Sequence, residues 1–294
     1  MAGPTTGSER VALVTGASAG IGLYTALGLA HAGFHVIMAG RDPARMERAR
    51  RTVAERSGAT QIEPALADFA SLAAVRGLAE RVLATHDRLD VLVNNAGLIT
   101  PRFRLSADGY ELTVAVNHLA PFLLTNLLLD RLRASAPARI VTVASQAHRG
   151  ARIDPATLTG REDWSPLKAY GRSKLCNILF TRALARRLDG SGVIASCLHP
   201  GVVATAIGDH AGRLAGFGWR LVKPFLVTPE KGAATSLFLA TTPDPMPFHG
   251  AYVIGRRVAE PDRTALDDEL GERLWAESAR LVGLTVIRAG RLAW

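Results

Sequence analysis

Short apolar runs alternate with longer segments of helical periodicity over the first two hundred residues of the chain. The apolar runs begin with RVALVTG (10–16) and FHVIMAG (34–40) and continue to VIASCLHPG (193–201). Parallel strands need helical crossovers between them, whereas antiparallel strands can be joined by short turns. The alternation therefore predicts an α/β fold, a doubly wound parallel sheet of about seven strands with helices on both faces.

No linker, repeat or low-complexity tract interrupts this pattern, so we expect one domain over residues 1–294. The first eight residues are expected to be a flexible N-terminus, and residues 284–294 form a tail that fits no predicted element. Residues 202–228 form a long loop, and long loops in compact domains often cover sites.

A glycine-containing turn follows the first strand in VTGASAGIG and leads into a helix. Gly16, Gly20 and Gly22 would let backbone N–H groups and the helix dipole approach a pyrophosphate without side-chain clashes. The pattern G-x-x-x-G-x-G differs from the G-x-G-x-x-G of many dinucleotide sites. The context predicts a dinucleotide-binding Rossmann domain, with further contacts from the neighbouring residues Ser18, Ala19 and Ile21.

Arg41 follows the second strand, where an acidic residue would hold the adenosine ribose hydroxyls of NAD. A guanidinium there suits a 2′-phosphate instead, so the sequence favours NADP(H) over NAD. The alternative is that Arg41 is a solvated residue, and we expect the adjacent Asp42 to cap the next helix. Asp68 would bond the adenine, and the residues after the fourth strand, Asn95, Ala96 and Gly97, would pack against the adenosine.

Three candidate catalytic side chains follow from position and spacing. Ser145 ends the fifth strand, at the sheet edge where ligands bind, and Tyr170 and Lys174 lie one turn apart on the next helix. A phenol titrates near ~10 in water and needs a nearby positive charge to transfer protons near neutral pH. Lys174 and an oxidised nicotinamide would supply that charge, so Tyr170 is the candidate general acid and base.

These motifs stand in the order TGASAGIG, NNAG, Asn117, Ser145, YGRSK and HPG over about residues 9 to 260. The set resembles the short-chain dehydrogenase/reductase family. The resemblance implies a catalytic group of Asn117, Ser145, Tyr170 and Lys174. It implies that Lys174 also binds the nicotinamide ribose, that Ser145 holds the substrate oxygen, and that Asn117 holds a relay water. The segment after HPG would bind the nicotinamide through Pro200, Gly201, Val203 and Thr205.

A long insert between Ser145 and Tyr170, together with the sequence around YGRSK and HPG, looks like the retinol dehydrogenase branch of that family. The resemblance implies an NADP-dependent enzyme that acts on CH–OH groups and interconverts an apolar alcohol with its aldehyde or ketone. Two alternatives stay open: a catalytically silent NADP-binding scaffold with a regulatory or interaction role, and an enone C=C reductase. Relatives often pair through the helices carrying Asn117 and Tyr170, so a homodimer or homotetramer is expected.

The long loop carries apolar side chains suited to a substrate lid: Leu214, Phe217, Trp219, Leu221 and Phe225. The same side chains could instead cover the core or a partner subunit. They could also touch a membrane surface, because Arg213, Arg220 and Lys223 lie beside them.

Composition limits which binding partners and which cellular location we expect. The net charge is +9, but the arginines are interleaved with acids and no nucleic-acid reader motif is present, so nucleic acid is not an expected partner. Cys176 and Cys197 are expected to be buried, and His199 is expected to be a packed side chain in a protein without a metal site. The uncharged stretch 112–129 contains Asn, His and Pro, which favours a buried helix over a transmembrane segment. We therefore expect a cytoplasmic protein.

Overall fold

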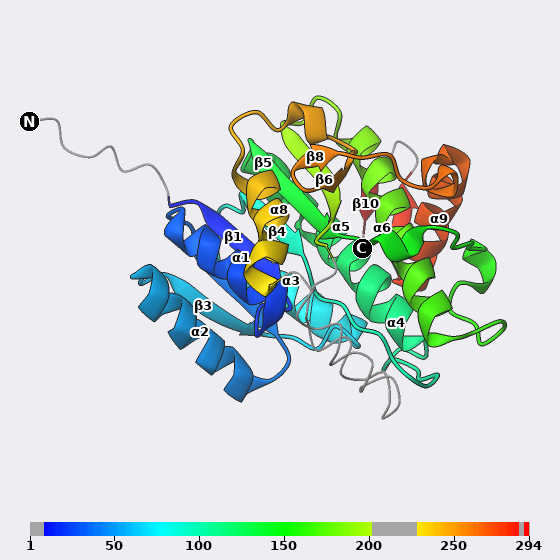
Figure 1. Cartoon of the computed structure of the whole chain (residues 1–294), viewed down its shortest axis with the longest axis horizontal. Helices are drawn as coiled ribbons and strands as arrows, with labels where there is room; N and C mark the ends of the chain where they lie inside the picture. Colours follow the sequence, from blue (N-terminus) through cyan, green and yellow to red (C-terminus); the bar gives the residue numbers. More distant parts are fainter. Residues whose placement is uncertain (1–8, 202–227, 288–290, 294) are drawn as a thin grey trace, which may run out of the picture.

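The computed structural model describes residues 9–201, 228–287 and 291–293 (Figure 1). Its main sheet contains seven parallel strands and one short antiparallel strand, in the order β3-β2-β1-β4-β5-β6-β7-β8. These strands are β1 (Val11–Thr15), β2 (His35–Gly40), β3 (Ile62–Leu66), β4 (Val91–Asn94), β5 (Ala138–Val143), β6 (Val193–His199), β7 (Tyr252–Ile254) and β8 (Arg257–Val258). The predicted doubly wound α/β fold is confirmed.

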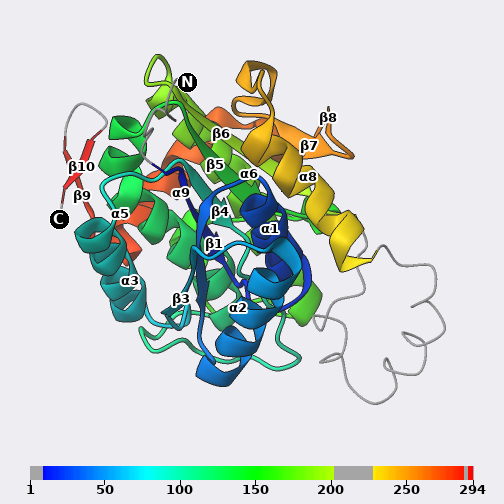
Figure 2. The ribbon, with the colours of Figure 1, turned by 90° about the vertical axis from the view of Figure 1, so that its left-hand side faces the viewer.

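Helices cover both faces of this sheet, and each face has its own apolar cluster (Figure 2). One face carries α1 (Gly20–His31), α2 (Pro43–Ser57) and α8 (Pro229–Thr241). The other carries α3 (Leu72–Thr85), α5 (Ala120–Ala134) and α6 (Pro166–Leu188), with α9 (Asp268–Leu281) packed on α6. Because both faces are covered, the strands are apolar on both sides, which explains the continuous hydrophobic runs in the sequence. The two cysteines are buried on the α6 side, as expected.

The strand order reverses around β1, which lies between β2 and β4. At such a reversal the connections after two neighbouring strands leave in opposite directions and open a crevice at the carboxyl edge of the sheet. The glycine turn after β1 and the Asn94–Gly97 segment after β4 both meet this crevice. The fold therefore brings together the segments that the sequence assigned to a dinucleotide.

The uncharged stretch forms a continuous helical segment from Leu112 to Ala134. It consists of α4 (Leu112–Val114), a π-helical turn (Ala115–Leu119) and α5. Among the described residues this is the one helical segment long and apolar enough to cross a membrane, and 89% of its most apolar 18-residue window is buried in the protein. Its packing is that of a core helix.

Two segments differ from expectation or fall outside the structure. The C-terminal residues predicted to fit no element form an antiparallel pair, β9 (Thr285–Ile287) and β10 (Arg291–Ala293). No element could be predicted there, because strands of three residues are too short to show an alternating pattern. The predicted lid lies outside the described residues except for Thr228, whose side chain caps α8 by accepting a hydrogen bond from the Lys231 N–H.

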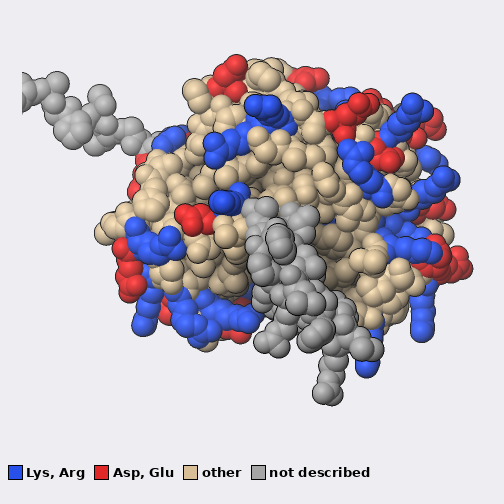
Figure 3. Space-filling model, in the orientation of Figure 1, with Lys and Arg blue, Asp and Glu red and all other residues tan. Residues whose placement is uncertain are grey.

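Much of the surface charge is arranged in mixed networks. Arg182, Arg186 and Arg187 of α6 pair with Asp268 and Glu272 of α9, for example with Arg186 Nη2 2.8 Å from Glu272 Oε1. Figure 3 shows basic and acidic side chains intermingled over the face in view. The arginine excess therefore does not form one uninterrupted basic surface on that face.

His118 gives the core a defined acid sensitivity. It is fully buried, donates to or accepts from Ser278 Oγ at 2.8 Å, and burial lowers its pKa from 6.5 to about 4. Between these two pH values the unfolded chain binds one more proton than the folded chain. The contribution of the neutral His118 to the free energy of unfolding is therefore fully present above pH 6.5 and is lost as the pH falls toward 4. The full difference corresponds to about 3 kcal/mol.

We predict that chemical denaturation between pH 7 and 4.5 will show a steeper loss of stability in the wild type than in His118→Gln. The exposed His31, the last residue of α1, supplies the matched control, and His31→Gln should keep the wild-type slope. Parallel slopes for wild type and His118→Gln would show that His118 is not the titrating group.

Candidate active site

The glycine turn between β1 and α1 forms a narrow backbone cradle. Gly16 and Gly20 have φ values of +65° and +57°, a region that residues with a side chain rarely adopt. A Cβ on Gly22 would lie 2.4 Å from the carbonyl oxygen of Gly16, so only glycine fits there. Helix α1 starts at Gly20 without a side-chain cap and without an acidic residue in its first turn. Its free N–H groups and positive dipole end suit a phosphate.

The segment after β4 is fastened to this cradle. Thr15 Oγ1 accepts hydrogen bonds from the N–H groups of Asn95 and Ala96, each at 2.9 Å. Asn95 Nδ2 donates to the Thr15 carbonyl oxygen at 2.8 Å. These contacts hold Asn95 beside Gly16 and line the crevice with backbone, as a dinucleotide site needs.

Arg41 directly follows β2 at the same sheet edge and is exposed. In the part of the chain that the structure describes, its guanidinium makes no hydrogen bond or ion pair. The carboxylate of Asp42 accepts from the Arg45 N–H at 2.9 Å and caps α2, as predicted, so this acid is already engaged. The position therefore offers a free cation to a ligand. Asp68 is exposed as well, and its carboxylate accepts from the Ala70 N–H at 3.0 Å in a local turn.

Ser145 and Tyr170 are brought together by a close approach of α6 to the end of β5. A Cβ on Gly171 would lie 2.7 Å from the Ala147 carbonyl oxygen, so glycine allows the helix to lie against the segment after Ser145. Burial raises the pKa of Tyr170, and a hydrogen bond with the Ser145 hydroxyl opposes that shift. Without a cofactor the phenol is therefore neutral at ordinary pH. The lowered phenol pKa that the sequence predicts requires more positive charge than the protein alone supplies.

Lys174 lies one turn further along α6 and is buried, with 3% of its surface exposed. Its Nζ donates to the Val143 carbonyl oxygen at 2.8 Å and lies 5.5 Å from the centre of the Tyr170 ring. Burial lowers the pKa of Lys174 to about 8, so the ammonium form still dominates at neutral pH. Asn177 Nδ2 donates to the same carbonyl oxygen at 3.3 Å.

Asn117 sits in the π-helical turn, where the backbone hydrogen-bond pattern of the long helix is interrupted. Its Oδ1 accepts from the Leu98 N–H at 2.8 Å, and its Nδ2 donates to the Leu98 carbonyl at 2.9 Å and to Ser173 Oγ at 3.0 Å. The Ser173 hydroxyl in turn donates to the Tyr170 carbonyl oxygen at 2.7 Å. Asn117 thus ties the segment after β4 to the start of α6.

The structure therefore places Asn117, Ser145, Tyr170 and Lys174 around one end of the crevice, with Gly97 next to Asn117 and Lys174. A Cβ on Gly97 would lie 3.6 Å from Lys174 Nζ and 3.3 Å from Asn117 Oδ1.

The segment after β6 lies at the same end of the crevice. His199 is buried, and its Nδ1 accepts from the Gln146 N–H at 3.4 Å, which agrees with the expected packed histidine. Gly201 follows Pro200 with φ of +88° and turns the backbone at the sheet edge. The predicted contacts Val203 and Thr205 lie outside the described residues.

Thr15, Ser173 and Asn177 were not predicted from the sequence, although they hold the predicted residues in place. Ser173 lies inside the YGRSK motif itself, and its i to i−3 bond to a backbone carbonyl is a common serine contact. Asn177 is three residues after Lys174 and therefore on the same helix face. Both spacings could have marked these two residues as supports.

Comparison with known proteins agrees with this geometry. Residues 10–213 match the short chain dehydrogenase family. The chain is 41% identical to human retinol dehydrogenase 13 over 94% of this chain and 85% of that protein, and 40% identical to mouse retinol dehydrogenase 14 over 94% and 86%. An uncharacterized protein of Mycobacterium paratuberculosis superposes with a TM-score of 0.76 at 36% identity, over 95% of both chains. A short chain dehydrogenase of Burkholderia cenocepacia in complex with NADP superposes with a TM-score of 0.67 at 27% identity, over 83% of this chain and 95% of that one.

These relatives correct the predicted location. The relatives named above are retinol dehydrogenases, and Leu112–Ala134 is long and apolar enough to cross a membrane although most of it is buried in the protein, which does not fit a plainly cytoplasmic protein. The prediction of a cytoplasmic protein was therefore wrong. It relied on composition and polar residues in one helix, and neither reports how a chain associates with a membrane surface.

The cradle, the free cation after β2 and the clustered Ser, Tyr, Lys and Asn side chains suit a nicotinamide dinucleotide, which this family of oxidoreductases binds. The chain is a member of the short-chain dehydrogenase/reductase family, in its retinol dehydrogenase-like branch.

Proposed function

We propose that the protein is an NADP(H)-dependent oxidoreductase that interconverts an apolar alcohol with its aldehyde or ketone. The observation that carries the proposal is the convergence of Ser145, Tyr170 and Lys174 beside a phosphate cradle. When bound, the cofactor supplies or accepts the hydride. The family members named above, retinol dehydrogenases by name, support the apolar alcohol as the substrate class.

Each side chain of the site has a distinct task in this proposal. The Tyr170 hydroxyl donates a proton to the substrate oxygen during reduction and removes one during oxidation. The Ser145 hydroxyl donates a hydrogen bond to the same substrate oxygen and stabilises the negative charge that develops there. The Lys174 ammonium favours the tyrosinate form and is held in place by the Val143 carbonyl oxygen.

Asn117 and Gly97 lie where the segment after β4 meets α6, and Asn117 holds the two together. The Asn117 side chain makes three hydrogen bonds, so it fixes the distance between the crevice floor and α6. Its proposed role in holding a relay water remains a prediction from the family resemblance. The glycine turn, with Ser18, Ala19 and Ile21, would hold the pyrophosphate, and Arg41 would hold the 2′-phosphate.

We predict that Arg41→Ala raises the Kd for NADPH by about ten- to hundredfold, because charge-assisted bonds to the phosphate are lost. The Kd for NADH should change little, since NADH has no phosphate at that position. Fluorescence titration of the dihydronicotinamide measures both constants. Arg48→Ala, which removes an exposed arginine within α2, serves as the control. Equal weakening of both cofactors by Arg41→Ala would refute the phosphate role.

The proposed activity itself is tested by following NADPH consumption with a panel of apolar aldehydes and ketones, with the products identified by mass spectrometry. Turnover that yields the alcohol supports the proposal. Tight NADPH binding without turnover of any carbonyl would favour a silent scaffold, and a product reduced at a C=C bond would favour an enone reductase.

A further inference from the structure

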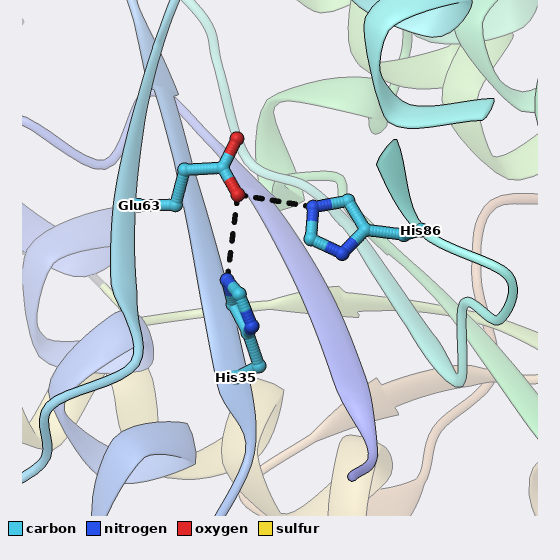
Figure 4. Close-up of side chains that lie close together, drawn as sticks. All are labelled: His35, Glu63 and His86. Carbon is cyan, nitrogen blue, oxygen red and sulfur yellow. Dashed lines mark hydrogen bonds and ion pairs between the residues drawn. The ribbon is translucent and has the colours of Figure 1, made fainter. Parts of the chain in front are cut away.

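Three potential metal ligands converge at the edge of the sheet opposite the active site (Figure 4). His35 is the first residue of β2, whereas Arg41 follows the other end of that strand. Glu63 lies on the neighbouring strand β3, and His86 follows the last residue of α3. None of the three has a place in the proposed reaction.

The ligand atoms point at one another. His86 Nε2 lies 3.0 Å from Glu63 Oε2, and His35 Nε2 lies 3.4 Å from the same oxygen. All three atoms lie within 4.8 Å of one another, and the two imidazole rings meet edge to face with centroids 4.9 Å apart. A tetrahedral zinc ion with bonds of about 2.0–2.2 Å needs ligand atoms about 3.3 Å apart. The two separations from Glu63 Oε2 are close to this value.

One of these nitrogens makes only the longer ion-pair contact with Glu63 and no hydrogen bond within the described protein. His35 Nε2 is buried and makes no hydrogen bond to any described residue, although it points toward the Glu63 carboxylate. Glu63 Oε2 makes its hydrogen bond with His86 instead. A buried nitrogen without a hydrogen bond is unfavourable, and a metal ion would accept electron pairs from both neutral imidazoles and the carboxylate at once.

The cluster also has access to solvent. His35 and His86 line a cavity of about 510 Å³, together with Glu9, Asp87 and Arg88. This space can admit an ion and hold the water needed to complete its coordination. Two of the other lining side chains are acidic and one is basic.

We propose that His35, Glu63 and His86 bind a divalent transition metal ion, best matched by Zn²⁺, through two imidazole nitrogens and one carboxylate oxygen. Two nitrogen donors favour zinc over calcium or magnesium, which prefer oxygen ligands. Water from the cavity would fill the open position. Because the ligands come from β2, β3 and the end of α3, the bound ion would join three elements and stabilise the fold without taking part in the oxidoreductase reaction.

The test uses the full chain without an affinity tag, treated with a chelator and dialysed. Competition titration with a zinc indicator should give one Zn²⁺ per chain at this site. The His86→Gln and Glu63→Gln variants should each bind Zn²⁺ at least about tenfold more weakly. This is the smallest loss expected even for a residue that only hydrogen-bonds to a metal ligand. His31→Gln removes a histidine outside the cluster and should bind as the wild type does. No stoichiometric binding, or unchanged affinity in both cluster variants, would overturn the proposal.

A second readout does not depend on variants. Zinc at about a hundredfold excess over its Kd should raise the Tm of the wild type by about 5 °C, and chelator should reverse this. In crystals grown with zinc, an anomalous difference peak should lie within bonding distance of His35 Nε2, Glu63 and His86 Nε2. A peak elsewhere only, with no shift in Tm, would show adventitious binding and refute the site.

Discussion

Tyr170→Phe is expected to lower kcat for carbonyl reduction by about 10³- to 10⁴-fold, the upper range for loss of a positioned proton donor. The variant removes one oxygen atom and keeps the ring. The ring lies within a packed segment of α6, so the fold should persist. The Kd for NADPH should stay within a few-fold of the wild-type value, because the cradle and Arg41 are untouched. Steady-state kinetics and fluorescence titration measure the two quantities.

Tyr110→Phe is the matched control. Tyr110 is a partly buried tyrosine whose hydroxyl donates to the Leu281 carbonyl oxygen at 2.7 Å, remote in sequence from the site. It should alter stability and leave kcat near the wild-type value. If Tyr170→Phe instead kept its activity, or lost activity only through unfolding detected by circular dichroism, Tyr170 would be a structural residue.

Lys174→Met should lower kcat/KM by about 10³-fold, because the charge that favours the tyrosinate is lost. Its thioether fills most of the buried space, and Asn177 still donates to the Val143 carbonyl oxygen. The pH dependence should change too, since the group required in its ionised form for alcohol oxidation would titrate at higher pH. Rates of oxidation measured from pH 6 to about 10 test this shift.

Lys168→Met controls for removing a lysine from the same helix. Lys168 is exposed and pairs with Asp163, so its loss should leave both the rate and the pH profile unchanged. An unaltered pH profile in Lys174→Met, even with a lower rate, would mean that Lys174 holds the structure and does not tune the phenol.

The sequence predicted those parts of the site that rest on local patterns. Strand-like runs with helices between them placed Gly16, Ser145 and Tyr170 at one sheet edge, because the carboxyl ends of parallel strands meet there. Asp42 was predicted as a helix cap from its position alone, and the structure has it in that role. Such features need only a few neighbouring residues to be recognised.

Features that depend on tertiary contacts could not be predicted. The π-helical turn at Asn117 leaves no clear trace in the apolar pattern, and the contact of Gly171 with the Ala147 carbonyl oxygen depends on how two elements meet. His35, Glu63 and His86 are spread over about fifty residues in three elements, so no motif joins them. The location of the protein in the cell is likewise a property that local sequence patterns did not reveal.

Bound cofactor, together with Lys174, is expected to bring the pKa of the Tyr170 phenol near neutral. The chain has four tyrosines, so ¹³C-labelled tyrosine gives few NMR signals, and Tyr170→Phe identifies the one from Tyr170. A pH titration of the protein with and without NADP⁺ is the most direct measurement. We predict that Tyr170 stays protonated at high pH in the free protein, as burial requires, and ionises near neutral pH with NADP⁺ bound. A Tyr170 signal that still titrates at or above ~10 with NADP⁺ bound would contradict it.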